Sequence, residues 1–387
     1  MSVTSVLPAK TEEMAQRKEI RDFVVREVIP FANQWDRQEY IPRDVIDKMA
    51  GMGYLGFTLP FKYGGQERGQ LNYGILNEEI GRGCSSLRSL ITVHSSLVTE
   101  TLARWGTKDQ CDTWLPSLAT GKQLAAFALS EPETGSDAKN IQTSFKETSG
   151  GFSISGIKKW ITFGQLADVF IVIAREDKGL SAFIVEKNTP GLHVKPLKGM
   201  LGTRASMLAE LHFENCIVPA ENLLGRRGMG FLQIINTALD NGRYSVACGS
   251  TGISKACLEE SIRFAKQRKQ FDVLLKDHQL TKRKISNMIA GVKSSQLLCR
   301  NAGKLREEKD PDAIIQTSLA KYVASTTANI IASDAVQLFG ALGCSPESNV
   351  ERYFRDAKVM EIIEGSTEIQ QILLADQGFQ NLNSIIE

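Results

Sequence analysis

The chain has 387 residues, of which 42% are hydrophobic and 23% charged, a size that predicts two or three packed units rather than one core. Lys and Arg number 46 against 44 Asp and Glu, and a net charge of +2 disfavours nucleic-acid and membrane-surface binding. No apolar run reaches the ~18 to 20 residues that cross a bilayer, and no secretory or organellar address is visible, so we expect a cytoplasmic protein.

Other residue types exclude several common chemistries. The seven cysteines are scattered, odd in number and without a C-x-x-C pair, which predicts buried thiols in a reducing compartment and no metal site. Four histidines far apart make a Ser-His-Asp triad unattractive. Neither a strand followed by G-x-G-x-x-G nor a P-loop is present.

Residues 1–122 carry mostly helical patterning. Apolar side chains recur at three- and four-residue spacing over 19–29, where Pro30 marks a kink or an end, and another helix is expected over 44–52. A turn-rich loop at 59–65 follows them.

From about residue 123 to 230 the apolar period changes from 3.6 to 2. Short strands are expected over 151–156, 169–174, 182–185 and 208–213, with turn residues between them. The middle third therefore predicts a small antiparallel β domain.

After residue 230 helices return, in long patterned segments over 231–265, 276–307 and 311–339. We expect a chain that is mainly α with a central β domain. Its predicted parts are an N-terminal helical domain (1–122), a middle β domain (123–230) and a C-terminal helical bundle (231–387).

Glu364 stands between an apolar run and Gly365, close to the C-terminus. Apolar neighbours desolvate a carboxylate, which raises its pKa toward the range where it can accept a proton near neutral pH. Glu364 is therefore a candidate catalytic base. The alternative is an ordinary helix-terminal Glu.

The loop over residues 127–137 combines hydroxyls, a Gly and a Pro turn that can aim donors at a polar ring or an anion. A plain Asx or Ser turn is the alternative. Trp160, beside Thr162, offers an aromatic face for a planar cofactor, although a Trp in a β domain is more often core.

Three further clusters could bind a ligand. Residues 268–271 with His278 and Gln279 could hold a pyrophosphate, or form a solvated helix end. Residues 337–343 end a helix with glycines that admit a close ligand, or form a helix C-cap. Asp240 and Arg243 could face a ligand or a partner helix.

Taken in order, these segments resemble the acyl-CoA dehydrogenase family over essentially the whole chain. The family's [LT]-[ST]-E-P-x-x-G-S-D loop appears at 129–137, its W-I-[ST]-[NF] strand at 160–163, and its K-x-x-x-G-x-R-x-S turn at 198–206. Its R-x-x-F and H-Q pairs appear at 268–271 and 278–279, and its Q-x-[FL]-G-[GA]-x-G turn at 337–343. Its E-R-x-x-R-D and E-G-[ST]-x-x-I-Q segments appear at 351–356 and 364–370.

The resemblance implies a three-domain fold with a C-terminal four-helix bundle, FAD as cofactor, and oxidation of the Cα–Cβ bond of an acyl thioester such as acyl-CoA. In the family, a Glu removes the α proton, the β hydrogen leaves as hydride to flavin N5, and the trans-2-enoyl product forms. By this mapping Glu364 is the base. Electron-transfer flavoprotein or oxygen is the implied acceptor, and a homo-oligomer, a tetramer built as a dimer of dimers, is expected.

The resemblance also assigns residues. Contacts to the substrate are implied for Ser136, Asp240, Arg243 and Gly365, and no metal is implied. The groups at 268–279 and 337–340 are expected to reach FAD bound to a neighbouring subunit. Contacts to FAD are implied for Phe127, Leu129, Ser130, Gly135, Ser136, Trp160, Thr162, Arg268, Phe271, Gln279, Gln337, Leu338, Gly340, Ser366 and Glu368.

Departures from the family pattern leave alternatives open. Some relatives carry the base at the position of Gly242, which has no side chain, so Asp240 is the nearest rival to Glu364. Asp272 replaces a common Gly and Glu368 a common amide. Gln371 and Asp376 lie where many relatives carry Arg, which makes an acyl- or aminoacyl-carrier protein an alternative to CoA. An oxygen-using flavin oxidase or monooxygenase and a non-catalytic helical scaffold are the rival functions.

Overall fold

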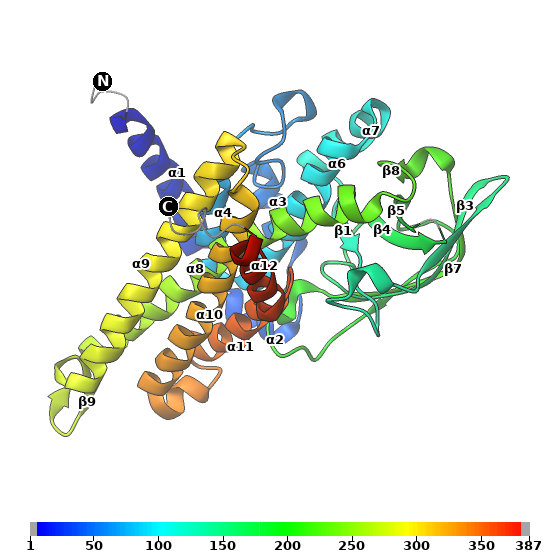
Figure 1. Cartoon of the computed structure of the whole chain (residues 1–387). Coiled ribbons are helices and arrows are strands. Elements are labelled where there is room, and N and C mark those ends of the chain that lie inside the picture. The colour runs from blue at the N-terminus through cyan, green and yellow to red at the C-terminus, as the bar shows by residue number, and fades with distance from the viewer. Residues whose placement is uncertain (1–5, 178, 381–387) are drawn as a thin grey trace.

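The computed structural model describes residues 6–177 and 179–380. Helices come first, a sheet follows, and helices fill the rest of the chain (Figure 1). A π-helical segment, Thr92–Thr99, joins two of the first helices. The N-terminal helices are α1 (Val6–Glu27), α2 (Ala32–Gln38), α3 (Arg43–Gly51), α4 (Gln70–Gly83), α5 (Ser85–Ile91), α6 (Glu100–Trp105) and α7 (Lys108–Ala119).

The middle part is an eight-stranded sheet with the order β6-β7-β3-β2-β4-β5-β8, and β1 pairs with β4. Its pairs are antiparallel as expected, except that β1–β4 and the short β2–β4 contact are parallel. The strands are β1 (Ala125–Ala128), β2 (Ser144–Thr148), β3 (Gly151–Ile161), β4 (Val169–Glu176), β5 (Gly179–Glu186), β6 (Leu192–Pro196), β7 (Ala209–Val218) and β8 (Leu223–Leu224).

The C-terminal part is a bundle of long helices (Figure 1). A two-residue turn joins β9 (Lys269–Gln270) and β10 (Val273–Leu274) between its first two helices. The helices are α8 (Asn236–Gln267), α9 (Gln279–Glu308), α10 (Ala313–Phe339), α11 (Asn349–Ile362) and α12 (Thr367–Gln380).

Two hydrophobic clusters stabilise these parts. The larger runs from the N-terminal helices through the sheet to the first half of α8, and includes Phe127, Phe183 and Tyr244. The smaller lies inside the bundle between α8, α9, α10 and α11, around Ile253 and Met360. Because α8 contributes to both, it links the sheet side of the molecule to the bundle.

One expectation about the cysteines is wrong. Six of the seven thiols are buried, but Cys344 is exposed. It ends the one-turn helix Gly340–Cys344 at the tip of the bundle, where the chain turns back toward α11. A helix tip offers few neighbours to cover a side chain.

Candidate active site

Glu364 lies in a tight turn between α11 and α12. Glu364 and Gly365 both adopt the left-handed conformation, with φ of 56° and 87°. This conformation is costly for Glu and easy for Gly. The turn is held through its carbonyl oxygens, since Arg243 Nε and Gln370 Nε2 each donate to Glu364 O at 3.3 Å. The strain is therefore maintained by side chains from α8 and α12.

The carboxylate of Glu364 packs against the backbone of Gly242 in α8. A Cβ atom on residue 242 would lie 2.6 Å from Glu364 Cδ and 2.9 Å from Leu97 Cδ1. Glu364 Oε2 is buried and accepts no hydrogen bond from the described residues. Burial raises the pKa of Glu364 to about 7, against the opposing charges of Arg243, Arg88 and Lys321. A buried carboxylate with a free oxygen and a near-neutral pKa is suited to accept a proton.

Asp240, the rival base, is engaged elsewhere. Its Oδ2 lies 2.6 Å from Arg306 Nη1 of α9, and Arg306 also donates to the side chain of Asn241. The ion pair fixes one oxygen of the Asp240 carboxylate, and only its Oδ1 is buried without a partner among the described residues. The geometry therefore favours Glu364 over Asp240, and it gives Asp240 a role in joining α8 to α9.

Arg88 is a functional candidate that the sequence reasoning missed. It lies on α5, is fully buried, and donates to Thr92 Oγ1 at 2.6 Å and to Met360 Sδ at 3.2 Å, whereas its Nε has no partner. Among the described residues no carboxylate lies within ion-pair distance of it. The only available signal was a single charge within the otherwise uncharged run 84–99.

Arg88 and Glu364 face the same side of α8. A Cβ atom on Gly249 would lie 2.7 Å from Arg88 Cδ, and Gly249 comes seven residues after Gly242, about two helical turns or ~10 Å along the axis. Burial lowers the pKa of Arg88 to about 10, and Glu364 is the largest opposing influence. Glu364, the candidate base, and the buried cation Arg88 therefore lie about two helical turns apart along one face of α8.

A buried ion pair between Lys158 and Glu131 anchors the start of the loop that follows β1. Lys158 Nζ, fully buried, donates to Leu129 O and to Glu131 Oε1, both at 2.8 Å. Glu131 also accepts from the backbone N–H groups of Gln142 and Thr143. Burial lowers the pKa of Lys158 to about 8, against the opposing pull of Glu131.

The far part of this loop is open. Phe127 and Leu129 are buried, Ser130 is half-buried, and Gly135 and Ser136 are exposed. A Cβ atom on Gly135 would meet no other atom within 4 Å. The anchored start and open end of the loop leave backbone groups available to a ligand.

Trp160, near the end of β3, presents a partly exposed aromatic ring, and Lys159 Nζ lies over it at 5.5 Å from the ring centroid. Its side chain is 42% exposed while Ile161 and Phe163 are buried, and its φ is 59°, a costly conformation for a bulky residue. Thr162 beside it is half-buried. An exposed indole held at positive φ fits a planar ring such as that of a flavin.

A short chain of contacts connects this part of the sheet to the base. Phe163 N donates to Ser206 O at 2.8 Å, and Ser206 Oγ lies 2.8 Å from Ser89 Oγ. Ser89 follows Arg88, whose charge acts on Glu364. The open indole and Glu364 thus belong to the same region of the molecule.

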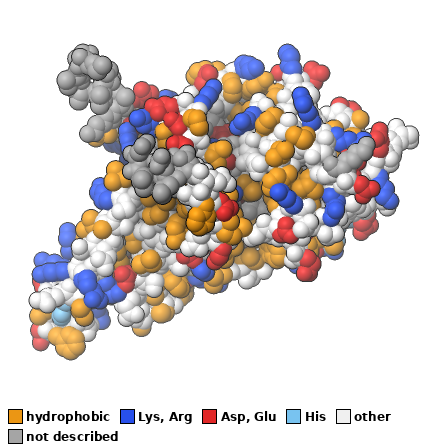
Figure 2. All heavy atoms as spheres, viewed as in Figure 1, with side chains coloured by type: hydrophobic (Ala, Val, Ile, Leu, Met, Phe, Trp, Pro, Cys, Tyr) orange, Lys and Arg blue, Asp and Glu red, His pale blue; other side chains and the backbone are white. Residues whose placement is uncertain are grey.

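The other predicted cofactor residues lie at the far end of the bundle from the sheet, near β9 (Figure 1). Phe264 and Phe339 stack there with ring centroids 4.1 Å apart, which brings the 268–279 group next to the 337–340 group. Figure 2 shows Lys and Arg side chains gathered at this end. Arg268, Phe271, Gln279, Gln337 and Gly340 are exposed, and Leu338 is half-buried.

One chain therefore carries two separated halves of the predicted FAD site. Phe271 is 89% exposed at the tip of the β9–β10 hairpin. Asp272 has a φ of 61°, which explains why this position suits Gly and tolerates Asp. A large exposed apolar side chain at a protruding tip is typical of a contact with another chain.

The remaining predicted residues surround the turn of Glu364. Ser366 is half-buried and Glu368 is exposed, and a hydrogen bond with Ser366 lowers the pKa of Glu368. Gln371 donates to the hydroxyl of Tyr322 at 3.2 Å. Arg243 reaches the turn through Glu364 O, as described above, so its first role in the structure is to hold the base.

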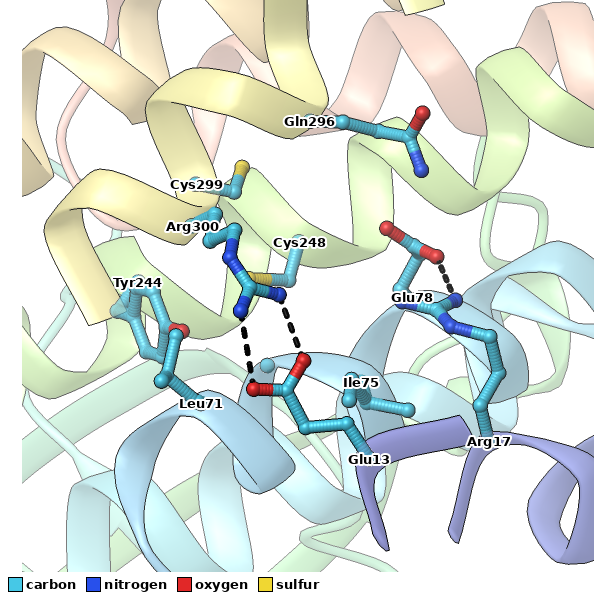
Figure 3. Close-up of a pocket in the computed structure, with 11 residues that line it drawn as sticks. Glu13, Arg17, Leu71, Ile75, Glu78, Tyr244, Cys248, Gln296, Cys299 and Arg300 are labelled. Atoms are coloured by element: carbon cyan, nitrogen blue, oxygen red, sulfur yellow. Dashed lines mark hydrogen bonds and ion pairs between the residues drawn. The ribbon is translucent and has the colours of Figure 1, made fainter. Parts of the chain in front are cut away.

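A pocket of about 110 Å³ lies between α1, α4, α8 and α9 and includes Tyr244 and Cys248 (Figure 3). The lining residues include two ion pairs, Arg300–Glu13 and Arg17–Glu78. Successive helical residues turn by ~100°, so Tyr244 projects from the side of α8 opposite Gly242, and neither Gly242, Glu364 nor Arg88 lines this pocket. This pocket is not part of the site around Glu364.

The described residues contain neither a membrane-spanning helix nor a metal-binding cluster of side chains. Across 6–177 and 179–380, no helix is both long enough and apolar enough to cross a membrane. The same part of the chain has no group of three or more His, Cys, Asp or Glu side chains placed to hold a metal ion.

Comparison with known proteins assigns this chain to the oxidoreductases that act on CH–CH groups. Residues 10–122, 126–216 and 228–379 match the N-terminal, middle and C-terminal domains of acyl-CoA dehydrogenases. The chain belongs to the acyl-CoA dehydrogenase family, whose members are flavoproteins. The predicted family and three-domain architecture are thereby confirmed.

Three similar proteins illustrate the range of this family. The mitochondrial short-chain specific acyl-CoA dehydrogenase of Rattus norvegicus is 36% identical over 385 residues, covering 98% of this chain and 93% of the relative. A glutaryl-coenzyme A dehydrogenase solved with glutaryl-CoA superposes with a TM-score of 0.91 at 31% identity, covering 98% and 96%. The prolyl acyl carrier protein oxidase AnaB superposes with a TM-score of 0.90 at 29% identity, covering 94% and 98%.

Proposed function

We propose that this protein is an FAD-dependent dehydrogenase that introduces the α,β double bond into an acyl thioester, with Glu364 as the base that removes the α proton. The observation that carries the proposal is the carboxylate of Glu364, which fills the space beside Gly242 and keeps Oε2 buried and unpaired. A pKa raised by burial to about 7 matches the requirement of a base that works near neutral pH.

The residues around the base would orient the thioester. The backbone N–H of Glu364 donates to no acceptor among the described residues, so it can donate to the thioester carbonyl and stabilise the negative charge that develops there as the α proton leaves. Arg243 and Gln370 fix the turn that aims this N–H. Bound FAD would supply the electron sink, taking up the β hydrogen with its electron pair.

The exposed groups fit that cofactor. Backbone and hydroxyl donors of Ser130, Gly135 and Ser136, the indole of Trp160 and the hydroxyl of Thr162 would hold the flavin ring. Ser366 and Glu368 would complete the site beside Glu364. Arg268, Phe271, Gln279, Gln337, Leu338 and Gly340 would hold the dinucleotide portion of FAD in a neighbouring copy, because they lie at the opposite end of their own chain.

This division of the cofactor site makes a homo-oligomer part of the proposal, and we propose a tetramer built as a dimer of dimers. We also propose that the chain divides near residues 122 and 230, works in the cytoplasm, and passes electrons to an electron-transfer flavoprotein or to oxygen. Asp240 would act near the thioester entrance through Arg243 and Arg306, and Gly365 would leave room for the substrate.

Arg88 supports a narrower substrate class, an acyl group that ends in a carboxylate. A buried guanidinium without an anion is costly, and a bound carboxylate would satisfy it. Gly242 and Gly249 lie ~10 Å apart along the axis of α8. A bound acyl group in this space would need a contact of about 3 Å to Glu364 at one end and a hydrogen bond of about 3 Å to Arg88 at the other. About 4 Å remains, which fits three carbon–carbon bonds of ~1.5 Å.

The similar glutaryl-coenzyme A dehydrogenase acts on such a group. The thioester carrier is a second variable. Because Gln371 and Asp376 replace basic residues of many relatives, and because AnaB is similar over most of this chain, we propose a carrier-protein thioester as the alternative to CoA.

The test is anaerobic bleaching of the bound flavin by matched CoA and carrier-protein thioesters. Wild-type protein should bleach, Glu364→Gln should bleach at least ~100-fold more slowly, and Glu361→Gln, a matched change three residues earlier, should resemble the wild type. Equal rates for Glu364→Gln and the wild type would remove Glu364 as the base. A comparable loss in Asp240→Asn alone would transfer the role to Asp240.

A further inference from the structure

Lys321 is a buried lysine of α10 whose ammonium group reaches the turn of Glu364. Its side chain is fully buried. Nζ donates to Gly365 O at 2.7 Å and to Glu361 O at 3.1 Å. These two carbonyls lie on either side of Glu364 in the sequence, so one ammonium group bridges the turn that carries the base.

The bridged carbonyls need a donor. Glu361 is in the last turn of α11, where carbonyl oxygens have no partner within the helix. Gly365 O belongs to a left-handed residue and has one other donor, Gln370 Nε2 at 3.1 Å. A charged donor forms stronger hydrogen bonds than a neutral one, so Lys321 is the strongest single constraint on Gly365 O.

Lys321 has no carboxylate partner of its own. In the described part of the chain no carboxylate oxygen lies within ion-pair distance of its Nζ. The charged groups that face it are Glu364 and Glu361 at the turn, Glu368 of α12 and Arg243 of α8. Burial lowers the pKa of Lys321 to about 8, and Glu364 is the largest influence that raises it.

The charge and the hydrogen bonds act on the same residue. Lys321 remains protonated at neutral pH, and its positive charge favours the carboxylate form of Glu364 together with Arg243 and Arg88. Of these three, Lys321 alone holds the carbonyls on both sides of the base, and no step of the proposed reaction employs it otherwise.

We propose that Lys321 is a positioning residue for Glu364, which fixes the left-handed turn through Glu361 O and Gly365 O and keeps the base ionised. The inference rests on the proposed role of Glu364 as the base.

Three holoenzyme variants separate the two parts of this role. Lys321→Met removes both the donors and the charge, Lys321→Gln keeps a donor without charge, and Thr326→Ala is the control, because its hydroxyl bonds only carbonyls of its own helix. The readout is the second-order rate of flavin reduction from pH 5 to 9, which reports the ionisation of the free enzyme, with flavin content and melting temperature measured alongside.

Lys321→Met is expected to move the acidic limb of the profile to higher pH by about one unit and to lower the plateau at least ~10-fold. Lys321→Gln is expected to show the same movement with a smaller loss of plateau, and Thr326→Ala neither. If Lys321→Met does not fold, Lys321→Gln carries the test of the charge.

An unmoved limb in flavin-loaded Lys321→Gln would overturn the proposal, even if the melting temperature falls. Failure of the proposed function gives a different pattern, since Glu364→Gln would then retain the wild-type rate whatever the Lys321 variants do.

Discussion

The carboxylate of Glu364 fills the space that a side chain on residue 242 would need, and Gly242 leaves that space free. The chain therefore has space for one carboxylate at this position, and on our proposal that carboxylate, supplied from the turn before α12 rather than from α8, is the base. The absence of a side chain at residue 242 is a requirement of the active site and not a weakness of the helix.

Gly242→Ala should consequently impair catalysis. Its Cβ would lie 2.6 Å from Glu364 Cδ, so the carboxylate must move, and a displacement near 1 Å costs about 100-fold in rate. We expect kcat/KM to fall by that order while flavin content stays near the wild-type value. Gly51→Ala, where a Cβ atom meets nothing within 4 Å, is the matched control and should keep full activity.

The pH dependence of the reaction should follow the ionisation of Glu364. Because the base must be deprotonated and burial raises its pKa to about 7, kcat/KM should rise with pH and level off above about pH 7 to 8. A rate that is already constant between pH 5 and 8 would contradict this, since Glu364 would then be ionised throughout the range.

The same carboxyl should make the protein less stable at high pH. Burial raises the pKa of Glu364 from its ordinary value of 4.5 to about 7 in the folded protein, so the folded state binds this proton more tightly than the unfolded chain. The stability that this carboxyl group contributes is fully present below pH 4.5 and is lost as the pH rises through about 7. At ~1.4 kcal/mol per pKa unit, the loss is about 3 kcal/mol.

Glu364→Gln removes this loss. The melting temperature of the variant should match the wild type near pH 5 and exceed it by a few degrees at pH 8, as measured by thermal unfolding in both buffers. A variant that is less stable at pH 8 would show that the ionised carboxylate contributes favourable contacts that outweigh its burial.

Lys158 should control flavin retention through the loop after β1. Lys158→Met leaves Glu131 buried without its cation, and breaking a buried pair costs about 3 to 5 kcal/mol. We expect a protein that loses flavin on dialysis and melts at a lower temperature. Lys159→Met, which removes a partly exposed pair with Glu210 at 3.2 Å, should retain flavin, and adding Glu131→Gln to Lys158→Met should restore part of the loss.

The candidate site residues that the sequence proposed are those that lie in contiguous segments. Glu364, the loop at 129–137 and Trp160 each sit in a short motif, and the change of apolar period placed the sheet between two sets of helices. The parallel pairing of β1 with β4 was missed, because a four-residue strand carries no signal for the direction of its partner.

Arg88 and Lys321 were also missed, for a different reason. Arg88 donates a hydrogen bond to Met360, which lies 272 positions away in the sequence. Lys321 donates to the carbonyls of Glu361 and Gly365, which lie at least 40 positions away. Neither lies in a motif, and a charged residue on a helix is usually solvated. Only the packing of α5 and α10 against the end of α11 shows that both charges are buried beside the base.

Arg88 should decide which acyl groups the enzyme accepts. Arg88→Met removes a cation that, on our proposal, pairs with a terminal carboxylate, and truncating one partner of such a buried pair costs about 2 to 5 kcal/mol. We expect kcat/KM for a carboxylate-ended acyl thioester to fall by about 30-fold or more relative to kcat/KM for an unbranched apolar thioester of equal length. The two are compared on the high-pH plateau, where loss of the Arg88 charge no longer affects the ionisation of Glu364.

The unliganded Arg88→Met protein should melt at or above the wild-type temperature, because Met replaces a buried charge that has no anion. Arg82→Met is the control, since Arg82 pairs with Glu259 at 2.5 Å at the end of α4 and should leave the preference between the two thioesters unaltered. If Arg88→Met lowered kcat/KM for both thioesters equally, Arg88 would serve the structure of the site and would not select the acyl group.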